Sequence, residues 1–380
     1  MEVERKPQDV GVELAPCPPS RLPAEPAERS DVVARDDDRV LRHTVGMYVS
    51  HVADGHVLDV AGRSVTITSP DKVFFSERRE TKLDLVRYYL AVAEPLLRAV
   101  RGRPTLMQRF PHGAEGSSFF QKRVPDSAPE WLQTTTVSTP NGTTARALVL
   151  ADMAHVVWAV NLACLGFHVW PYLADRPDVA DELRLDLDPQ PGVGFDHVRA
   201  AAAELRSLLD ELGIAGYPKT TGNRGLHVYV RLEARWDSYQ VRAAAVAAAR
   251  ELERRRPDLI TAAWWKEERG ERVFLDYNQN APHKTVFGPW SVRARPGAQV
   301  STPLSWDEVV VVHPDELTIA SVPQCGDPWA RMNEVPQSLE PLLELHERDR
   351  GSGLLDAPWP PVYPKQPDEP PRVAPSRAKR

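Results

Sequence analysis

The sequence contains few cysteines, and their placement argues against two common kinds of scaffold. Cys17, Cys164 and Cys325 are scattered along the 380-residue chain, and no two of them form a Cys-x-x-Cys pair. An odd, scattered set of cysteines argues against a disulfide framework and against a thiolate zinc site. We therefore expect a protein of the reducing cytoplasm.

Long apolar runs are also missing from the sequence. The longest apolar stretch, residues 148–169, is interrupted by Asp152, His155 and Asn161. The N-terminus carries charged residues where a secretory signal requires an apolar run. We expect neither export nor membrane insertion.

Positive charge is not in excess over the whole chain. The sequence has 47 Lys and Arg against 53 Asp and Glu, a formal net charge of -6. A chain with this balance can bind nucleic acid only through a local basic patch, so net charge neither supports nor excludes DNA as a ligand. Hydrophobic residues make up 42% of the chain, which is enough to build a core.

Composition divides the chain into one folded unit and two tails. Residues 1–43 mix prolines with charges, and residues 351–380 are proline-rich and end in basic residues. Such segments bury too little apolar area to offset the entropy lost on ordering. We expect a single folded domain over residues 44–350.

Hydrophobic patterning within this domain predicts both helices and strands. Thr81 can cap a helix that Pro95 should divide. Two short strands, residues 57–60 and 65–68, have the spacing of a β-hairpin. Farther along the chain the pattern predicts helices over residues 154–166, 198–212 and 239–255 and strands over 183–187, 226–230 and 273–277.

Two carboxylates share one face of the predicted strand 183–187. Leucines alternate with charged residues there, so Asp186 and Asp188 lie on the face opposite the leucines. Paired oxygen ligands suit Mg²⁺ or Mn²⁺, and Asp276, in the apolar strand 273–277, is the natural third carboxylate. An Asp-x-Asp pair at a strand end is nevertheless common without a metal.

A glycine-containing loop lies between these acidic segments. Residues 219–227 read Lys-Thr-Thr-Gly-Asn-Arg-Gly-Leu-His. Glycines allow the backbone to approach a phosphate closely, and Arg224 and His227 offer charge-assisted hydrogen bonds. The same residues would also suit an ordinary turn before a strand.

Three motifs taken together resemble a known family. In order, DLD, TTGNRGLH and FLDYNQN are similar to the motifs of the archaeo-eukaryotic primase superfamily, and most similar to those of the polymerase domain of bacterial end-joining ligase D. The segments SPDKVFFSE, TKLDLVRYY, RGRPTLMQRFP, SSFFQKR, LGFHVWP and SVRAR extend the resemblance. It implies an α/β (α+β) fold, with a mixed, largely antiparallel sheet flanked by helices and an N-terminal subdomain.

The resemblance also implies a two-metal nucleotidyltransferase. Asp186, Asp188 and Asp276 would be its catalytic residues and would coordinate two Mn²⁺ or Mg²⁺ ions. Eight residues would surround the nucleoside triphosphate substrate: His168, Thr221, Asn223, Arg224, His227, Arg269, Gln279 and Arg293. By residue type alone, His168 would pass for a core histidine and Arg269 for a solvated turn residue.

Contacts to DNA follow from the same resemblance. Lys72 and Lys82 match lysines that hold the 5′-phosphate downstream of a gap, and Phe119 and Phe120 match aromatics that stack on template bases. Two basic residues near them, Arg109 and Lys122, complete the expected DNA contacts. The family's Ser-Gly-Ser-Lys-Gly loop is Thr-Gly-Asn-Arg-Gly here, and Gln108 stands where related polymerases can carry a lysine.

The implied function is template-dependent addition of nucleotides, preferably ribonucleotides, to DNA ends or gaps that carry a 5′-phosphate. Repair such as non-homologous end joining, in the nucleoid-associated cytoplasm, is the expected setting. No Lys-x-Asp-Gly ligase motif occurs, so we expect a stand-alone polymerase that works with a separate DNA ligase and a Ku-like end-binding protein. Two alternatives stay open: a primase that starts chains de novo, and a catalytically weak module that binds DNA ends.

Overall fold

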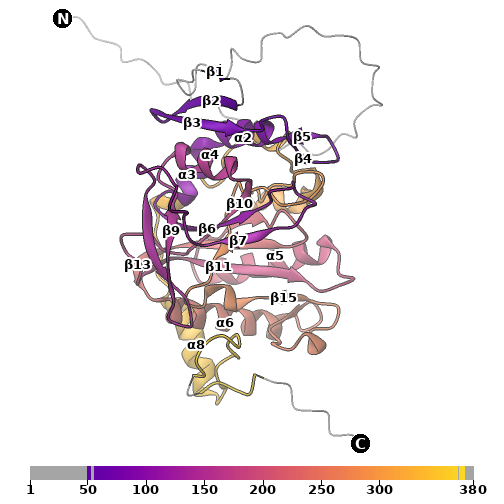
Figure 1. Cartoon of the computed structure of the whole chain (residues 1–380). Coiled ribbons are helices and arrows are strands. Elements are labelled where there is room, and N and C mark those ends of the chain that lie inside the picture. Colours follow the sequence, from indigo (N-terminus) through magenta and orange to yellow (C-terminus); the bar gives the residue numbers. More distant parts are fainter. Residues whose placement is uncertain (1–48, 53–54, 367, 373–380) are drawn as a thin grey trace, which may run out of the picture.

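The computed structural model describes residues 49–52, 55–366 and 368–372 (Figure 1). The N-terminal tail expected over residues 1–43 lies outside these described residues. Two β-sheets form the centre of the fold, and helices pack around them. The mixed, largely antiparallel fold class predicted from the sequence is confirmed.

The first sheet carries the strands with the acidic motifs. Its order is β12-β13-β11-β15-β14, and its pairs are antiparallel except for the parallel pair β14–β15. The strands are β11 (Ala180–Pro189), β12 (Tyr217–Thr220), β13 (Leu226–Trp236), β14 (Ile260–Thr261) and β15 (Val273–Leu275). Helices α5 (Phe195–Glu211) and α6 (Ser238–Arg255) pack against β11. Leu183, Leu185 and Leu187 of β11 are fully buried, as their alternation predicted.

The second sheet is antiparallel throughout and has the order β16-β10-β6-β9-β8, with β7 also paired to β6. Its strands are β6 (Pro104–Arg109), β7 (Phe119–Gln121), β8 (Thr134–Ser138), β9 (Thr144–Val149), β10 (Cys164–Val169) and β16 (Val286–Phe287). Buried Arg184 of β11 donates hydrogen bonds to the carbonyls of Val169 and Trp170, at 2.7 and 3.0 Å. One side chain of the first sheet thus contacts the end of β10 in the second.

The N-terminal part of the described chain packs beside the second sheet and confirms two local predictions. Strands β2 (Gly55–Val60) and β3 (Arg63–Thr68) form the predicted hairpin, and β1 (Val49–Val52) pairs with β2. Thr81 forms a capping box with Asp84 at the start of α2 (Lys82–Ala91). Pro95 lies in the first turn of α3 (Ala93–Val100), where proline is tolerated, so the predicted division of the helix is confirmed.

Several shorter elements and the last helices complete the described chain. They are β4 (Val73–Phe75), β5 (Glu80–Thr81), α4 (Met153–Asn161), α7 (Trp306–Val311) and α8 (Glu340–Gly351), and the 3-10 helices η1 (Lys266–Glu268), η2 (Tyr277–Asn280), η3 (Pro314–Glu316), η4 (Val322–Gln324) and η5 (Met332–Glu334). Across the described ranges, none of the helices has both the length and the apolar character needed to cross a membrane.

Two predicted elements end earlier in the structure than the sequence pattern suggested. The helix predicted over 154–166 ends at Asn161, because residues from Cys164 onward pair with β6 and β16. Gly166 permits this packing, since a Cβ there would lie 2.4 Å from the Phe287 ring. The strand predicted over 273–277 ends at Leu275, and Asp276 instead caps η2.

The segment after Gly351, predicted as a tail, packs onto the domain within residues 354–366 and 368–372. Trp359 and Tyr363 form a buried cluster with Ala281, and Arg242 of α6 donates to the carbonyl of Ala357 at 2.8 Å. Two aromatic side chains supply apolar area that the proline-rich composition concealed. Of the cysteines in the described residues, Cys164 is a free, buried thiol.

Candidate active site between the two sheets

Four polar residues form a row across the first sheet. Lys219 of β12 pairs in register with His227 of β13, which pairs with Asp186 of β11. Asp276, just after β15, donates its backbone N–H to the Asp186 carbonyl at 2.9 Å. Residues in register across antiparallel strands present side chains on the same face. The row therefore lies on the face opposite the buried leucines of β11.

Two of the three predicted metal ligands come together in this row. Gln279 Nε2 lies 3.3 Å from Asp186 Oδ2 and 3.0 Å from Asp276 Oδ2, so one amide bridges both carboxylates. Burial raises the pKa of both carboxyl groups to about 6. At Asp276 the negative charge of Asp186 raises the pKa further. At Asp186 the positive charges of Lys219 and Arg293 partly oppose the effect of burial. Asp188 is exposed, and its pKa is raised by partial burial and then by Asp186.

The arrangement of the carboxylates fits a divalent cation only in part. Within the described ranges, no group of three or more His, Cys, Asp or Glu side chains is arranged to ligate one ion. Asp186 and Asp276 nonetheless have the chemistry of ligands, because two partly buried carboxylates near each other are costly to ionise without a cation. The Gln279 amide donates a hydrogen bond to each of them. The structure thus brings Asp186 and Asp276 together and leaves Asp188 exposed at the edge.

Cationic and imidazole side chains surround this carboxylate pair. His227 Nε2 lies 3.3 Å from Asp186 Oδ1, and burial keeps the pKa of His227 well below its ordinary value. Lys219 is fully buried, donates to the Ser301 hydroxyl, and has a pKa lowered mainly by burial. Sequence reasoning did not assign Lys219 to the site. Lys219 could be assigned only from its register with His227, and that register depends on how the strands pair.

His168 belongs to β10 of the second sheet, and Arg293 lies beyond the end of β16. The His168 ring packs edge-on against Phe120 and Phe287, at 5.2 and 5.1 Å between centroids, and burial lowers its pKa to about 3, assisted by Arg293 and Lys219. The Arg293 guanidinium lies 3.6 Å above the Phe287 ring, and its Nε donates to the Thr221 carbonyl at 2.8 Å. Arg293 thereby lies between the glycine loop and the second sheet.

The glycine loop is held by its own threonine. Thr221 Oγ1 accepts hydrogen bonds from the backbone N–H groups of Asn223 and Gly225, both at 3.2 Å. Gly225 is required by close approach, because a Cβ there would lie 2.6 Å from the Leu187 carbonyl oxygen. Asn223 and Arg224 are exposed at the tip of this loop.

Arg269 occupies the other side of the carboxylates. Its Nε and one terminal nitrogen donate to the carbonyls of Ala263 and Trp264, each at 3.0 Å, and its guanidinium lies 3.5 Å above the Phe274 ring. Burial and the Asp186 charge raise the pKa of Asp276 and of Asp188, and the Arg269 charge partly opposes this, so Arg269 acts electrostatically on the site. Arg269 is therefore a largely buried residue and not a solvated one.

The predicted 5′-phosphate lysines lie side by side at the N-terminal part of the fold. The backbone N–H of Lys82 donates to the Lys72 carbonyl at 2.8 Å. The Lys82 ammonium donates to the Asn161 carbonyl at 3.2 Å, and burial followed by the Lys72 charge lowers its pKa. Lys72 is exposed. Two neighbouring positive charges are thus held together, one of them at the surface.

The predicted template aromatics lie at the surface on β7. Phe119 is 47% exposed and Phe120 is 57% exposed. The Arg109 guanidinium lies 5.2 Å from the Phe119 ring and donates to the Gln121 amide oxygen at 2.6 Å. Lys122 follows this strand, and burial followed by the Lys122 charge lowers the pKa of His283. Because Phe120 contacts His168, this surface borders the candidate active site.

Enzymes that transfer phosphoryl or nucleotidyl groups use carboxylates to hold metal ions and cationic side chains to balance phosphate charge, and both kinds of side chain meet at this site. Residues 81–329 match the family described as LigD, primase-polymerase domain. The match covers more than half of the chain, and the chain belongs to this family. The family predicted from the sequence motifs is confirmed, and the domain that defines this family is a nucleotidyltransferase.

Individual relatives and a solved structure agree with the family match. The multifunctional non-homologous end joining DNA repair protein LigD of Mycobacterium tuberculosis is 35% identical over 253 residues, 64% of this chain and 33% of that protein. The bifunctional non-homologous end joining protein LigD of Bacillus subtilis is 35% identical over 243 residues, 64% of this chain and 39% of that protein. The chain thus spans little more than a third of these relatives.

A solved structure is similar over most of the fold. The polymerase domain of Mycobacterium tuberculosis ligase D in complex with DNA superposes with a TM-score of 0.68 at 31% identity, over 72% of this chain and 99% of that one.

Proposed function

We propose that this chain adds nucleotides, with a template, to DNA ends or short gaps during repair such as non-homologous end joining. The observation that carries the proposal is the partly buried pair Asp186 and Asp276, with the cations Lys219 and Arg293 near Asp186, in a chain of the primase-polymerase family. The DNA bound to the related polymerase domain supports DNA as the ligand. A Ku-like protein, a separate ligase and a cytoplasmic, nucleoid-associated location belong to the same proposal.

Each group of side chains has a task in this reaction. Asp186 and Asp276, joined by Asp188, would hold Mn²⁺ or Mg²⁺, and when bound the ions would lower the pKa of the primer 3′-hydroxyl and neutralise phosphate charge. Arg293, Arg269 and Lys219 would balance the charge of a nucleoside triphosphate. The low pKa of His168 and of His227 keeps both imidazoles neutral, so each can donate one N–H without adding charge.

The DNA would lie along the surface that borders His168. Exposed Phe119 and Phe120 would stack on template bases, with Arg109 and Lys122 near the backbone. Lys72 and Lys82 would hold the downstream 5′-phosphate as point charges. The exposed residues Asn223 and Arg224 would reach the triphosphate from the glycine loop.

The proposal is tested by extension of a labelled primer across a short, 5′-phosphorylated gap, with each ribo- and deoxyribonucleoside triphosphate and with Mg²⁺ or Mn²⁺. We expect extension that is lost in Asp186→Ala plus Asp188→Ala and kept in the control Asp175→Ala plus Asp178→Ala, whose carboxylates are exposed elsewhere. Gap binding without extension under any metal would indicate an end-binding module. Synthesis on single-stranded template without a primer would indicate a primase.

A further inference from the structure

The 3-10 helix η2 holds Asp276, and both of its asparagines anchor it. Asp276 Oδ1 accepts a hydrogen bond from the Asn278 backbone N–H at 3.0 Å. The Asn280 side chain exchanges two hydrogen bonds with the Arg184 backbone, at 2.9 and 2.7 Å, and so fastens η2 to β11. The side chain of Asn278 has other partners, which lie in α6 and in the segment after α8.

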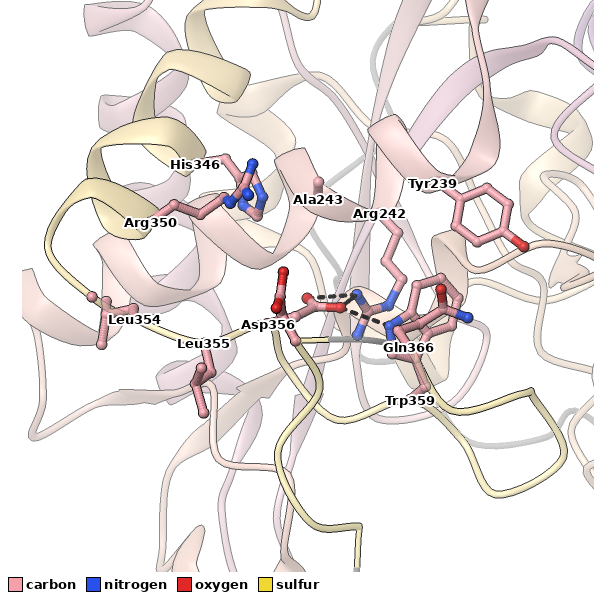
Figure 2. A pocket seen from close by; sticks show the side chains of 12 residues that line it. Tyr239, Arg242, Ala243, His346, Arg350, Leu354, Leu355, Asp356, Trp359 and Gln366 are labelled. Atoms are coloured by element: carbon pink, nitrogen blue, oxygen red, sulfur yellow. Dashed lines mark hydrogen bonds and ion pairs between the residues drawn. The ribbon is translucent and has the colours of Figure 1, made fainter.

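The side chain of Asn278 connects η2 to Arg242 of α6 and to the segment after α8. Its Oδ1 accepts from Arg242 Nε at 2.8 Å, and its Nδ2 donates to the Pro358 carbonyl at 3.1 Å. Arg242 is 1% exposed, and one terminal nitrogen of it contacts both carboxylate oxygens of Asp356, at 3.0 and 3.2 Å (Figure 2). The contacts therefore run without a break from Asp276 through Asn278 and Arg242 to Asp356.

The segment that supplies Asp356 is itself firmly attached. Trp359 Nε1 donates to Asp356 Oδ2 at 2.7 Å, and the Trp359 ring stacks on the Arg242 guanidinium at 3.9 Å. The Trp359 backbone N–H donates to Glu369 Oε1 at 2.7 Å, and Glu369 is buried and paired with Arg372. The segment that supplies Asp356, Trp359, Glu369 and Arg372 lies outside residues 81–329, the part of the chain that the family model matches.

The same side chains border an open pocket of about 490 Å³, which also has Tyr239, His346 and Arg350 in its lining (Figure 2). None of the predicted metal, nucleotide or DNA residues lines it. Both Arg242 and Asp356 thus line this pocket, and Arg242 also contacts Asn278 of η2. Their role toward Asp276 is separate from anything that the pocket could bind.

We propose that Arg242 and Asp356 are positioning residues for Asp276, so that the segment after α8 sets the geometry of the carboxylate pair. A guanidinium with two carboxylate contacts has a fixed orientation, which in turn fixes the Asn278 amide and the start of η2. Removal of Asp356 leaves a buried, unpaired charge, and η2 must shift or loosen. The inference deepens the proposed function, because it concerns the carboxylate that would hold the ion.

The test compares three variants of the full chain. Asp356→Ala leaves Arg242 unpaired, Arg242→Met plus Asp356→Ala removes both charges, and Arg350→Ala is the control, since Arg350 lines the same pocket but pairs with Glu347. Mn²⁺ is titrated without DNA or nucleotide, with free Mn²⁺ followed by electron paramagnetic resonance. Hydrogen exchange of amides 276–280 is measured by mass spectrometry in the same samples.

We expect Mn²⁺ affinity to fall about tenfold in both Asp356→Ala and Arg242→Met plus Asp356→Ala, as when a residue that orients a metal ligand is lost. Hydrogen exchange in η2 should accelerate in both variants. Thermal stability should recover in the double variant, because no unpaired charge stays buried. Loss of thermal stability with unchanged Mn²⁺ affinity and unchanged exchange in η2 would overturn the inference.

If the wild type takes up no Mn²⁺, exchange in η2 alone decides the matter. If Mn²⁺ affinity and exchange change as expected while the wild type extends no primer, the positioning role stands and the proposed function fails.

Discussion

At the scale of single residues, burial determines how the carboxylate pair titrates. The pKa of Asp186 and of Asp276 rises from 3.8 to about 6 in the folded, metal-free protein. Between about pH 4 and pH 6 the folded state therefore holds more protons than the unfolded chain. The contribution of these groups to stability falls as pH rises through this window and stays lowest above it.

Because the contribution of these carboxyl groups to stability falls as pH rises, removal of their charge and binding of a metal ion should both stabilise the protein more at high pH. We expect Asp186→Asn plus Asp276→Asn to melt at a higher temperature than the wild type in chelator at pH 7.5, with a smaller difference at pH 5. Mn²⁺ should raise the melting temperature of the wild type more at pH 7.5 than at pH 5. The double variant should not respond to Mn²⁺, whereas the exposed pair Asp175→Asn plus Asp178→Asn should respond as the wild type does. An equal response at both pH values would contradict the raised pKa.

The two neighbouring lysines support a second prediction at this scale. Lys72→Gln plus Lys82→Met keeps most of the side-chain volume and removes both charges. We expect the preference for 5′-phosphorylated over unphosphorylated gaps to fall about tenfold, the loss of one charge-assisted hydrogen bond, while extension of a simple primer is kept. Competition between the two gaps measures this preference, with Arg101→Gln, an exposed position, as the control. Equal loss on both substrates would remove the lysines from the phosphate site.

At the scale of elements, β7 presents two large aromatic side chains that its partner strand leaves uncovered. β7 pairs with β6, and Phe119 and Phe120 stay about half exposed. Exposed aromatic side chains beside cationic ones suit base stacking better than core packing. The exposure leaves both rings accessible to a ligand, so β7 is a candidate binding surface.

Because Phe119 and Phe120 are exposed, their removal should affect DNA binding and leave the stability of the protein nearly unchanged. Phe119→Ala plus Phe120→Ala should weaken binding of a gapped template by roughly 1–3 kcal/mol per stacked base and change the melting temperature little. Fluorescence anisotropy with labelled DNA measures the DNA affinity, and thermal melting measures the stability. Val310→Ala, also exposed and apolar, serves as the control. A large loss of stability with unchanged DNA affinity would return the pair to a structural role.

At the scale of the whole molecule, the segment after α8 closes the fold over α6 and η2. Trp359 is 3% exposed, and it joins Arg242, Asp356 and Tyr363 in one cluster. A segment of this kind belongs to the cooperative unit of the domain. Its prolines limit the number of conformations lost on folding, which offsets part of the ordering cost.

The attachment of this segment makes a prediction about global stability. Trp359→Ala should lower the free energy of unfolding by about 3–5 kcal/mol, as is usual for loss of a buried aromatic side chain. Val362→Ala, 68% exposed in the same segment, should change it little. Chemical denaturation followed by circular dichroism measures both variants, and an effect as small for Trp359 as for Val362 would show that the segment contributes little.

Local patterns in the sequence were enough to predict the elements with strong local signals. The hairpin at residues 61–62, the capped helix after Thr81 and the alternation in β11 depend on neighbouring residues, so the sequence encodes them directly. The order of the three motifs likewise predicted the family. Residues 164–166 were misread as helix because their strand pairs with distant strands.

Only the tertiary structure decided which of these residues meet. Asp186 and Asp276 converge because antiparallel register brings β11 and β15 together, whereas Asp188 stays at the edge although it belongs to the same motif. Lys219, Arg242 and Asp356 contact residues far away in the chain, and no local pattern encodes such contacts. Burial then sets the pKa values, because desolvation depends on the whole surrounding fold.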